Sequence, residues 1–323
     1  MNEVPVPSAC MASANDPWPK KWVAAIRLPF LTASLMSVVA AIAACWWAYG
    51  PVRWGFAGLA LAGIALIHAG ANLANDYFDY RSGADPANLC PTPFSGGSRV
   101  LVEGVLTPRA VLAAAVLFTL AGCACGIYLW RHTPGYTLLI IGMMGVALAW
   151  LYVAPPVRLA HRGVGELAVG VCFGILPAMG TEWVLRGRLS PEGSWVGVPA
   201  GLLVAAILLI NEFPDAAPDA FAGKRTLMVR LGPGRAALLY AALLALMYAS
   251  VLAAVLLRWM PALAALVFLV TPLSVRITRL LHAKHGDVPA LIPGMAGTIL
   301  QQVVVLLVLT GAYVADLALR TWR

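Results

Sequence analysis

The stretch Asn72-Leu-Ala-Asn75-Asp76-Tyr-Phe-Asp79-Tyr-Arg81-Ser-Gly-Ala-Asp85 closes a long apolar run that begins near Trp54. In a helix, residues 72, 75, 76 and 79 share one face, and His68 extends this face by one turn. Carboxylates and amides at the end of a membrane-length helix are costly unless something binds them. Mg²⁺ prefers such hard oxygen ligands and usually brings phosphate oxygens with it. A helix end whose acids simply face water is the alternative interpretation.

A second polar stretch also ends a long apolar run. It reads Asn211-Glu-Phe-Pro214-Asp215-Ala-Ala-Pro218-Asp219-Ala-Phe-Ala-Gly-Lys224-Arg225-Thr, with Asn211, Asp215 and Asp219 spaced four apart. The chain has only fourteen acidic residues, and five of them are the aspartates of these two stretches. Two acidic clusters with Lys224 and Arg225 nearby predict one metal–diphosphate site built from both halves of the chain.

The composition is that of a membrane protein. Hydrophobic residues make up 61% of the chain and charged residues 11%, whereas soluble proteins carry roughly 25% charged residues. The apolar runs exceed the ~18 residues typical of a spanning helix. We therefore predict an all-α membrane protein, a bundle of nine transmembrane helices with a central cavity open at the cytoplasmic side. The nine expected spans are Leu28–Tyr49, Trp54–Ala74, Ala110–Trp130, Tyr136–Val153, Val164–Leu185, Ser194–Ile210, Arg235–Leu257, Pro261–Leu281 and Gly297–Leu319.

The distribution of basic residues predicts the orientation of the bundle. Fifteen of the 22 Lys and Arg residues fall on the side that holds the N-terminus and both acidic clusters. By the positive-inside rule, this side is cytoplasmic and the C-terminus lies outside, in a cell (inner) membrane protein. The net charge of +8 therefore indicates membrane topology and not a nucleic-acid partner.

The chain is expected to form one transmembrane domain, residues 22–323, after a loose N-terminal tail, residues 1–21. Asp79 and Asp219 each follow the second span of a four-span group. This placement predicts an internal duplication of spans one to four and five to eight, with a ninth span appended. The six cysteines are scattered, mostly within apolar segments, and predict no disulfide framework.

Each acidic stretch raises a local structural question. Gly83 is expected to end the first helix, so that Asp85 would fold back from a loop as a metal ligand. Pro214 and Pro218 each remove a helical hydrogen bond, and an interior proline costs ~3 kcal/mol. One resolution is that the sixth span ends or kinks at Phe213 and that a new turn starts at Pro214.

Other polar residues have competing interpretations. Tyr152 and Arg158 flank two prolines at the cytoplasmic end of the fourth span, where the tyrosine is either an interfacial anchor or a cation–π partner. The turn from Ser95 to Arg99 could cradle phosphate with backbone N–H groups. Glu166 is explained by its helix N-terminal position. Interhelical hydrogen bonding is expected for three intramembrane residues, His68, Gln301 and Gln302.

Taken together, the motifs resemble those of the UbiA superfamily of intramembrane aromatic prenyltransferases over roughly residues 22 to 320. The resemblance rests on the Asn75–Asp85 tract, on Tyr152-Val-Ala-Pro-Pro-Val-Arg158-Leu, and on Asn211 to Thr226. The longer gap before Asp85, with Val102-Glu-Gly and Leu227-Met-Val-Arg-Leu-Gly, is most similar to the menaquinone branch, the dihydroxynaphthoate polyprenyltransferases. The Asn211-Glu-Phe-Pro-Asp215 start and Val153 depart from the common pattern, which leaves the acceptor more open than the reaction type.

The resemblance implies Mg²⁺-dependent transfer of a polyprenyl group from a polyprenyl diphosphate to an aromatic acceptor in quinone biosynthesis. The catalytic residues it implies are Asp76, Asp79, Asp215 and Asp219. The implied Mg²⁺ ligands are these four aspartates and Asp85. The implied diphosphate-binding residues are Asn72, Asn75, Lys224, Arg225 and Arg158. The substrate cavity is expected to include Tyr152, His68 and Asn211.

Alternatives remain at this stage. The acceptor could be 4-hydroxybenzoate, homogentisate, or a chlorin or haem ring. In another class, the acidic clusters would form the ion site of a membrane transporter, for which carboxylates near the membrane midplane are expected. Chain length, oligomeric state and the general base are left open by the sequence.

Overall fold

The computed structural model describes residues 12–321, which form helices and loops without a β-strand. Eight helical segments in this part of the chain are long and apolar enough to cross a membrane. Their component helices are η1 (Leu28–Leu31) with α2 (Thr32–Tyr49), α3 (Trp54–Ser82), α5 (Pro108–Trp130), α7 (Gly165–Gly170) with the π-helical turn η3 (Val171–Ile175) and α8 (Leu176–Arg186), α9 (Pro191–Ser194) with α10 (Gly197–Phe221), α11 (Leu227–Leu256), η4 (Ala262–Val270) with α12 (Thr271–Lys284), and α13 (Val288–Thr321).

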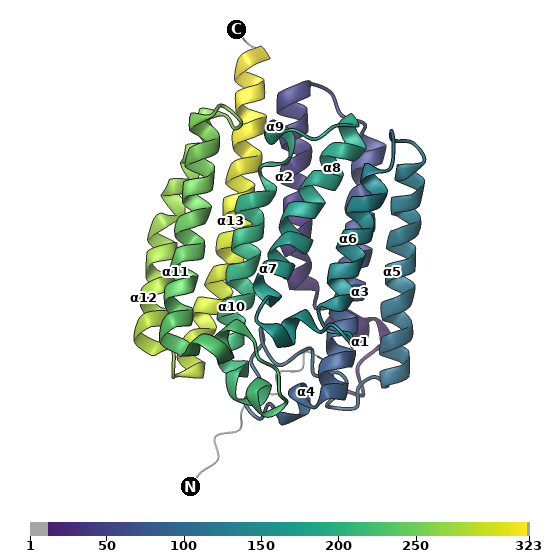
Figure 1. The fold of residues 1–323 in the computed structure, drawn as a ribbon, viewed down its shortest axis with the longest axis vertical. Helices are drawn as coiled ribbons and strands as arrows, with labels where there is room; N and C mark the ends of the chain where they lie inside the picture. Colours follow the sequence, from purple (N-terminus) through teal and green to yellow (C-terminus); the bar gives the residue numbers. More distant parts are fainter. Residues whose placement is uncertain (1–11, 322–323) are drawn as a thin grey trace.

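The fourth expected span is a shorter apolar helix, α6 (Thr137–Leu151). At 15 residues it falls below the usual spanning length, although it runs beside α5 and α8 in the same bundle (Figure 1). The prediction of nine spans is therefore supported for eight of them, and the crossing by α6 stays a prediction. Three further short helices are α1 (Trp18–Ala25), α4 (Ala84–Ala87) and η2 (Leu159–Arg162).

The N-terminal tail expected over residues 1–21 lies partly outside the described residues. Its last part is helical, because α1 begins at Trp18, directly after Pro17. Ala24 and Ala25 of α1 are buried against α3 and the loop around Val100, so this helix joins the small core at the same end of the molecule.

Local signals in the sequence explain where several helices begin and end. Thr107 caps α5 by accepting a hydrogen bond from the Ala110 N–H (3.3 Å), and Pro108 follows at the first helical position. Gly83 ends α3 with φ 86°, the left-handed conformation that favours glycine, as predicted. Gly232 has φ 74° within α11 and kinks that helix near its start.

Glycine pairs let the helices approach closely. A Cβ atom on Gly122 of α5 would lie 2.8 Å from the carbonyl oxygen of Gly63 on α3. A Cβ atom on Gly201 of α10 would lie 2.6 Å from the carbonyl oxygen of Gly170 on α7. Small residues at such contacts are typical of membrane bundles, where association depends on close van der Waals packing.

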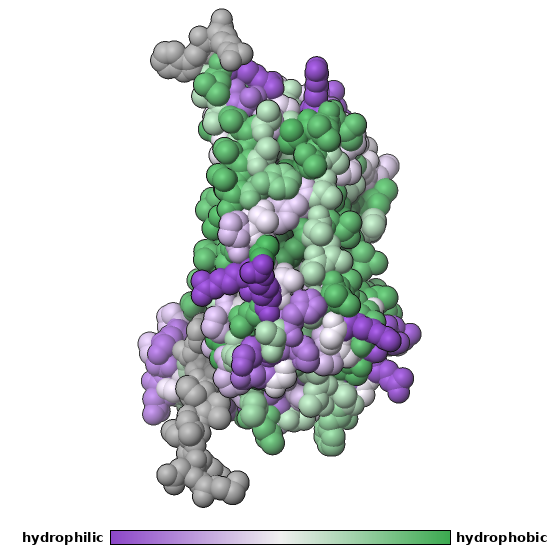
Figure 2. Space-filling view, turned by 90° about the vertical axis from the view of Figure 1, so that its left-hand side faces the viewer, coloured by the Kyte–Doolittle hydropathy of each residue, from purple (hydrophilic) through white to green (hydrophobic). Residues whose placement is uncertain are grey.

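The bundle has a polar end and an apolar body. Figure 1 shows α4 and the connection from α10 to α11 at the lower end, while α13 ends at the top. Figure 2 shows a broad hydrophobic belt over the face turned to the viewer, with hydrophilic residues gathered toward the lower end and again at the top. The largest core cluster joins α2, α10, α11, α12 and α13.

Candidate active site

The first acidic cluster lies in the last two turns of α3. Asp76 and Asp79 are buried, with 2% and 6% of their surfaces exposed. The Ser98 N–H donates to Asp76 Oδ1 (3.2 Å), and the Ser98 hydroxyl donates to Oδ2 of the same carboxylate. Asn75 Nδ2 donates to Asp79 Oδ2 (3.1 Å). The Ser98 N–H, in the turn from Ser95 to Arg99, therefore holds a carboxylate, and phosphate binding by this turn stays a prediction.

The second cluster lies near the C-terminal end of α10, which does not stop at Phe213. The helix continues from Gly197 to Phe221 with Pro214 and Pro218 inside it, so the suggested ending at Phe213 is wrong. Asp215 accepts hydrogen bonds from Asn88 Nδ2 (2.8 Å) and from the Gly96 N–H (3.1 Å). The loop after α3 thus contacts the second cluster directly.

Lys224 joins the two clusters. Its Nζ lies 3.1 Å from Asp79 Oδ2 and 3.4 Å from Asp219 Oδ1. Burial on its own lowers the pKa of Lys224, but the carboxylates of Asp79 and Asp219 outweigh this effect, so its pKa is raised well above the usual value. Two helix ends 140 residues apart in the chain therefore meet around one buried cation.

Asp85 is the third carboxylate from the first stretch. It lies in the one-turn helix α4, directly after Gly83, and 8% of its surface is exposed. Burial, followed by the neighbouring Asp79 and Asp76 carboxylates, raises its pKa well above the usual value. Gly97, at φ 70°, faces this carboxylate so closely that a Cβ atom there would overlap it. The loop backbone is thus packed onto the acidic cluster.

A cavity of about 150 Å³ connects these groups. The residues predicted for the site that line it are Asn72, Asn75, Asp79, Asp85, Tyr152, His68, Asn211, Asp215, Asp219 and Lys224. Asp76, Arg158 and Arg225 are not among its lining residues. Asp76 faces Ser98 instead, and Arg225 is exposed. The side chain of Asn72 also serves the fold, since its Nδ2 donates to the Ile26 carbonyl (2.9 Å).

Three polar residues lining the cavity had no role in the sequence interpretation. Arg27 was counted only as a topological charge, yet it lines the cavity and has its guanidinium 4.4 Å from the centre of the Phe30 ring. Asn88 lies in a loop without a recognisable pattern. Glu212 directly follows Asn211, is buried, and accepts from the Met228 N–H (3.4 Å). The spacing of Glu212, three residues before Asp215, was the available signal.

Two aromatic side chains, Tyr152 and His68, line the cavity. Tyr152 directly follows α6. His68 forms a 2.7 Å hydrogen bond between Nδ1 and Ser34 Oγ and stacks on Phe173 at 4.1 Å. The expected interhelical hydrogen bond of His68 is thus confirmed.

The other intramembrane amides and Glu166 give a mixed result. Gln302 Nε2 donates to the Thr32 carbonyl (3.2 Å), as expected between helices. Gln301 is fully buried and its side-chain amide has no hydrogen-bond partner among the described residues, so that part of the prediction is wrong. Glu166 stands in the first turn of α7 but is buried, with its carboxyl group beside that of Glu212. Its helix position alone does not account for such burial.

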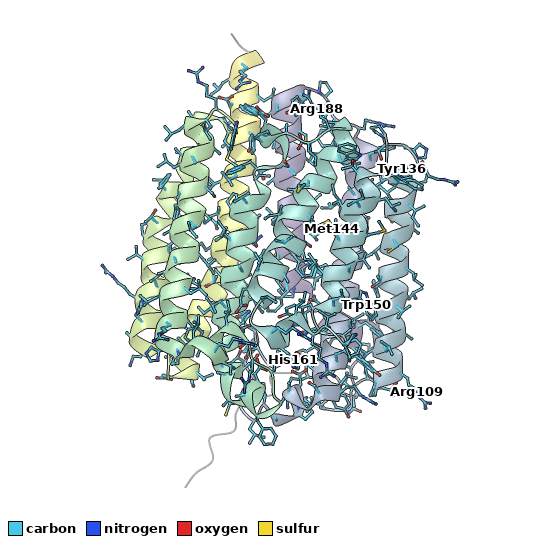
Figure 3. The ribbon with its side chains drawn as sticks, in the orientation of Figure 1. Arg109, Tyr136, Met144, Trp150, His161 and Arg188 are labelled. Atoms are coloured by element: carbon cyan, nitrogen blue, oxygen red, sulfur yellow. The ribbon has the colours of Figure 1, made fainter. Side chains whose placement is uncertain are left out.

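His161 lies on η2, and Figure 3 shows it in the lower part of the bundle. Burial lowers its pKa, while Asp79 raises it, and the net shift is downward. His161 is therefore neutral at physiological pH and adds no cation to the site.

The carboxylates fit a divalent cation by charge and chemistry. Five aspartates lie at the cavity or next to its wall. In the described chain, Lys224 is the one cation that forms an ion pair with any of them. Hard oxygen donors with uncompensated negative charge are the ligands of Mg²⁺. Across residues 12–321, however, no three His, Cys, Asp or Glu side chains already stand together as a metal-binding group. Lys224, Asn88, Gly96 and Ser98 hold the carboxylates instead.

Comparison with known proteins gives a consistent result. The chain matches the UbiA prenyltransferase family over residues 34–295. It is 35% identical over 225 residues to the 1,4-dihydroxy-2-naphthoate octaprenyltransferase of Mycobacterium tuberculosis, covering 70% of this chain and 74% of that protein. The enzyme of the same name from Mycobacterium leprae is 30% identical over 292 residues, 90% of this chain and 95% of that protein. The predicted resemblance, including the menaquinone branch, is confirmed.

Solved structures share the fold. A UbiA homolog from Archaeoglobus fulgidus bound to DMAPP and Mg²⁺ superposes with a TM-score of 0.63 at 17% identity, covering 88% of this chain and 99% of that one. The apo structure of a UbiA homolog from Aeropyrum pernix K1 gives a TM-score of 0.64 at 18% identity, covering 88% and 97%. At these identities the likeness concerns the helical architecture.

Proposed function

Because this chain belongs to the UbiA prenyltransferase family, we propose that it transfers a polyprenyl group from a polyprenyl diphosphate to a dihydroxynaphthoate-type acceptor in a menaquinone-like pathway. Family membership makes it a prenyltransferase, an enzyme that transfers alkyl or aryl groups other than methyl. The observation that carries the proposal is the ion pairing of Lys224 with both Asp79 and Asp219 in one cavity. The names of the relatives favour a naphthoate over the other acceptors.

The acidic side chains are the proposed cation site. Asp76, Asp79, Asp85, Asp215 and Asp219 would hold Mg²⁺, which when bound neutralises the charge of the diphosphate as it leaves. The neighbours solved with Mg²⁺ support divalent metal use in this fold. Asn75 and Lys224 line the cavity beside these carboxylates, where an amide and a cation can donate to phosphate oxygens. Arg158 and Arg225 lie off the cavity wall and take part only if the surrounding loops move.

The bond-breaking and bond-forming steps would take place beside the part of the cavity wall that lies away from the carboxylates. Cleavage of the C–O bond to diphosphate leaves an allylic carbocation, the electron-rich acceptor ring then forms the new C–C bond, and the ring proton departs to a base. Tyr152, His68 and Phe173 line the cavity, and an aromatic ring there would stabilise a cation. The apolar packing of the helices around it excludes water, which would otherwise capture the carbocation.

The proposed setting is the inner membrane, with nine crossings that include α6. The N-terminus and both acidic clusters would be cytoplasmic and the C-terminus outside, as the distribution of basic residues predicts. A transporter has no supporting observation here, since the carboxylates lie near the C-terminal ends of α3 and α10 and in α4, at one end of the bundle.

The test is transfer by the purified protein in lipid nanodiscs. We expect octaprenyl diphosphate and 1,4-dihydroxy-2-naphthoate to give a prenylated product, detected by mass, only when Mg²⁺ is present. Asp79→Asn and Asp215→Asn should each reduce transfer by ~10² or more, because each removes a charge that the cation site needs. Asp287→Asn, an exposed acid on the connection before α13, is the matched control and should keep full activity.

Equal activity of Asp79→Asn and the wild type would overturn the metal–diphosphate assignment. Transfer to 4-hydroxybenzoate or homogentisate but not to the naphthoate would support the proposed prenyl transfer and refute the proposed acceptor.

A further inference from the structure

Two buried glutamates, Glu166 and Glu212, lie next to each other and have no part in the proposed cation site. Glu166 is in the first turn of α7, and Glu212 is on α10, three residues before Asp215. Only 3% and 6% of their surfaces are exposed, and their carboxyl groups are close enough to share a proton. Ionisable groups inside a membrane bundle are costly to bury and usually mark a functional site.

The two carboxyl groups act as one acidic unit. Two carboxylates in contact and away from water would repel each other, so one proton is held between them and the pair carries one negative charge. Glu212 is the member that lines the cavity, whereas Glu166 is not among the lining residues. Glu212 Oε2 also accepts from the Met228 N–H (3.4 Å). The pair therefore presents a hydrogen-bond acceptor to the cavity through Glu212.

The side chain of Asn211 adds a second acceptor to the same wall. Asn211 directly precedes Glu212, lines the cavity, and has 7% of its surface exposed. Its Oδ1 atom is buried and has no hydrogen-bond partner among the described residues. Because an unpaired buried acceptor destabilises a protein, this oxygen is suited to a ligand that brings a hydrogen-bond donor.

Both acceptors lie deeper in the bundle than the aspartates of α10. The helical rise places Glu212 ~4.5 Å and Asn211 ~6 Å from Asp215 along the axis, on the side away from the polar end. Tyr152 borders the same space, since it lines the cavity and a Cβ atom on Gly165 would meet its ring at 3.2 Å. An aromatic ring bound here would lie next to the diphosphate that the aspartates are proposed to hold, without taking its place.

Among the ligands of the proposed reaction, the aromatic acceptor is the one that brings hydroxyl donors. Diphosphate oxygens accept hydrogen bonds, and a polyprenyl chain has no polar hydrogen atom. Mg²⁺ could use a further carboxylate, but five aspartates are already offered to it. A hydrogen bond from a ring hydroxyl to a charged acceptor is about twice as strong as one between neutral groups. It also increases the electron density of the ring that forms the new C–C bond.

We propose, building on the proposed function, that Asn211 and Glu212 form the subsite for the acceptor ring and that Glu212 accepts a hydrogen bond from a ring hydroxyl. The proton shared by the two glutamates then stays with Glu166, which donates it in a hydrogen bond to Glu212. Glu212 thus touches the substrate, and Glu166 is a positioning residue that acts through it. The ligand class is an aromatic ring with a free hydroxyl group, which a methyl ether of the same ring does not provide.

The first experiment separates the two substrates and the metal kinetically. In nanodiscs, Glu212→Gln should lower kcat/KM for 1,4-dihydroxy-2-naphthoate by roughly tenfold to a hundredfold, because the charged acceptor is lost. The KM for octaprenyl diphosphate and the Mg²⁺ concentration that gives half the maximal rate should stay near the wild-type values. Glu192→Gln, on α9 at the opposite end of the bundle, is the control and should leave all three values unchanged (Figure 1). A change confined to the Mg²⁺ dependence would make Glu212 a metal ligand and overturn the proposal.

The second experiment tests whether Glu166 positions Glu212. Glu166→Leu removes the group that donates to Glu212, so it should lower kcat/KM for the naphthoate as Glu212→Gln does. Glu166→Gln keeps an N–H donor at this place and should restore most of the loss. An unchanged KM for octaprenyl diphosphate in these variants shows that they fold. A loss in Glu166→Gln as large as that in Glu166→Leu would refute the positioning role.

The third experiment tests the hydroxyl group without the reaction. Calorimetry on the protein without a prenyl donor compares the binding of 1,4-dihydroxy-2-naphthoate and 1,4-dimethoxy-2-naphthoate. The wild type should prefer the hydroxylated ring, and Glu212→Gln and Asn211→Leu should each reduce this preference. The same preference in Glu212→Gln as in the wild type would overturn the subsite and leave the proposed function intact. Absence of transfer by the wild type would instead refute the proposed function, while calorimetry still decides the subsite.

Discussion

Lys224 shows what could and could not be foreseen for a single residue. The sequence predicted that this lysine stands beside both acidic stretches, because its distance from Asp219 is short and the aspartates cluster. Its actual partners, Asp79 at 3.1 Å and Asp219 at 3.4 Å, depend on how α3 and α10 pack. Asn88 and Gly96, which hold Asp215, could not be found in this way, since loop residues without periodicity carry no positional signal.

Replacing Lys224 by methionine tests whether the buried cation balances the carboxylates. Lys224→Met should reduce prenyl transfer by ~10² and lower the melting temperature measured in EDTA, because breaking a buried ion pair costs roughly 3–5 kcal/mol. Mg²⁺ should restore part of the lost melting temperature by supplying positive charge. The raised pKa keeps Lys224 charged from about pH 6 to about pH 9, so the effect should not vary over this interval.

Lys284→Met is the control, since this lysine is exposed at the end of α12. Lys224→Arg, which retains the charge, should keep most of the melting temperature. A Lys224→Met protein as stable in EDTA as the wild type would contradict the role given to this cation.

Among the elements, α10 departs most from expectation. The prolines at 214 and 218 predicted an end or a kink at Phe213, because each removes an N–H donor from the helix. The helix nevertheless continues through both, since its preceding turns are largely buried and pack against α2, α7, α11 and α13. Tertiary packing here outweighs a local cost of ~3 kcal/mol per proline, and that packing cannot be read from the segment alone. The capping glycine of α3, a purely local signal, was predicted correctly.

The close contact of α10 with α7 and η3 gives a test of element packing. Gly201→Val should lower the melting temperature in detergent by an amount equivalent to roughly 1–3 kcal/mol, because a side chain there meets the Gly170 carbonyl. Gly311→Val is the control, because it changes helix propensity in the same way but its Cβ atom meets nothing within 4 Å. The two variants should therefore differ by several degrees in thermal unfolding, and equal melting temperatures would argue against the contact.

For the whole molecule, the sequence predicted an all-helical membrane bundle, and composition alone was sufficient for that. Residues 12–321 include eight segments of full spanning length and the shorter α6. Spanning segments are recognisable because hydrocarbon imposes a minimum apolar length, whereas their exact ends depend on caps and loops. The convergence of the two acidic clusters at one end followed from counting spans between them, which is a global property of the chain.

Reporter fusions test the orientation and the crossing by α6 together. In a bacterial host, alkaline phosphatase fused after Thr133 should be active and green fluorescent protein there dark, because the α5–α6 connection is expected outside. After Arg162, on the other side of α6, the pattern should be reversed. A C-terminal fusion should behave like the one after Thr133. The same pattern at Thr133 and Arg162 would contradict the crossing.

The short length of α6 has a consequence for the surrounding lipid. Its 15 residues give ~22 Å of helix, against a hydrocarbon thickness of ~30 Å. A crossing by α6 would therefore thin or deform the adjacent leaflets, at a cost of fractions of a kcal/mol for each ångström. The deformation would fall beside α5 and α8, which pack against α6. A thinner host membrane should therefore match α6 better than a thick one.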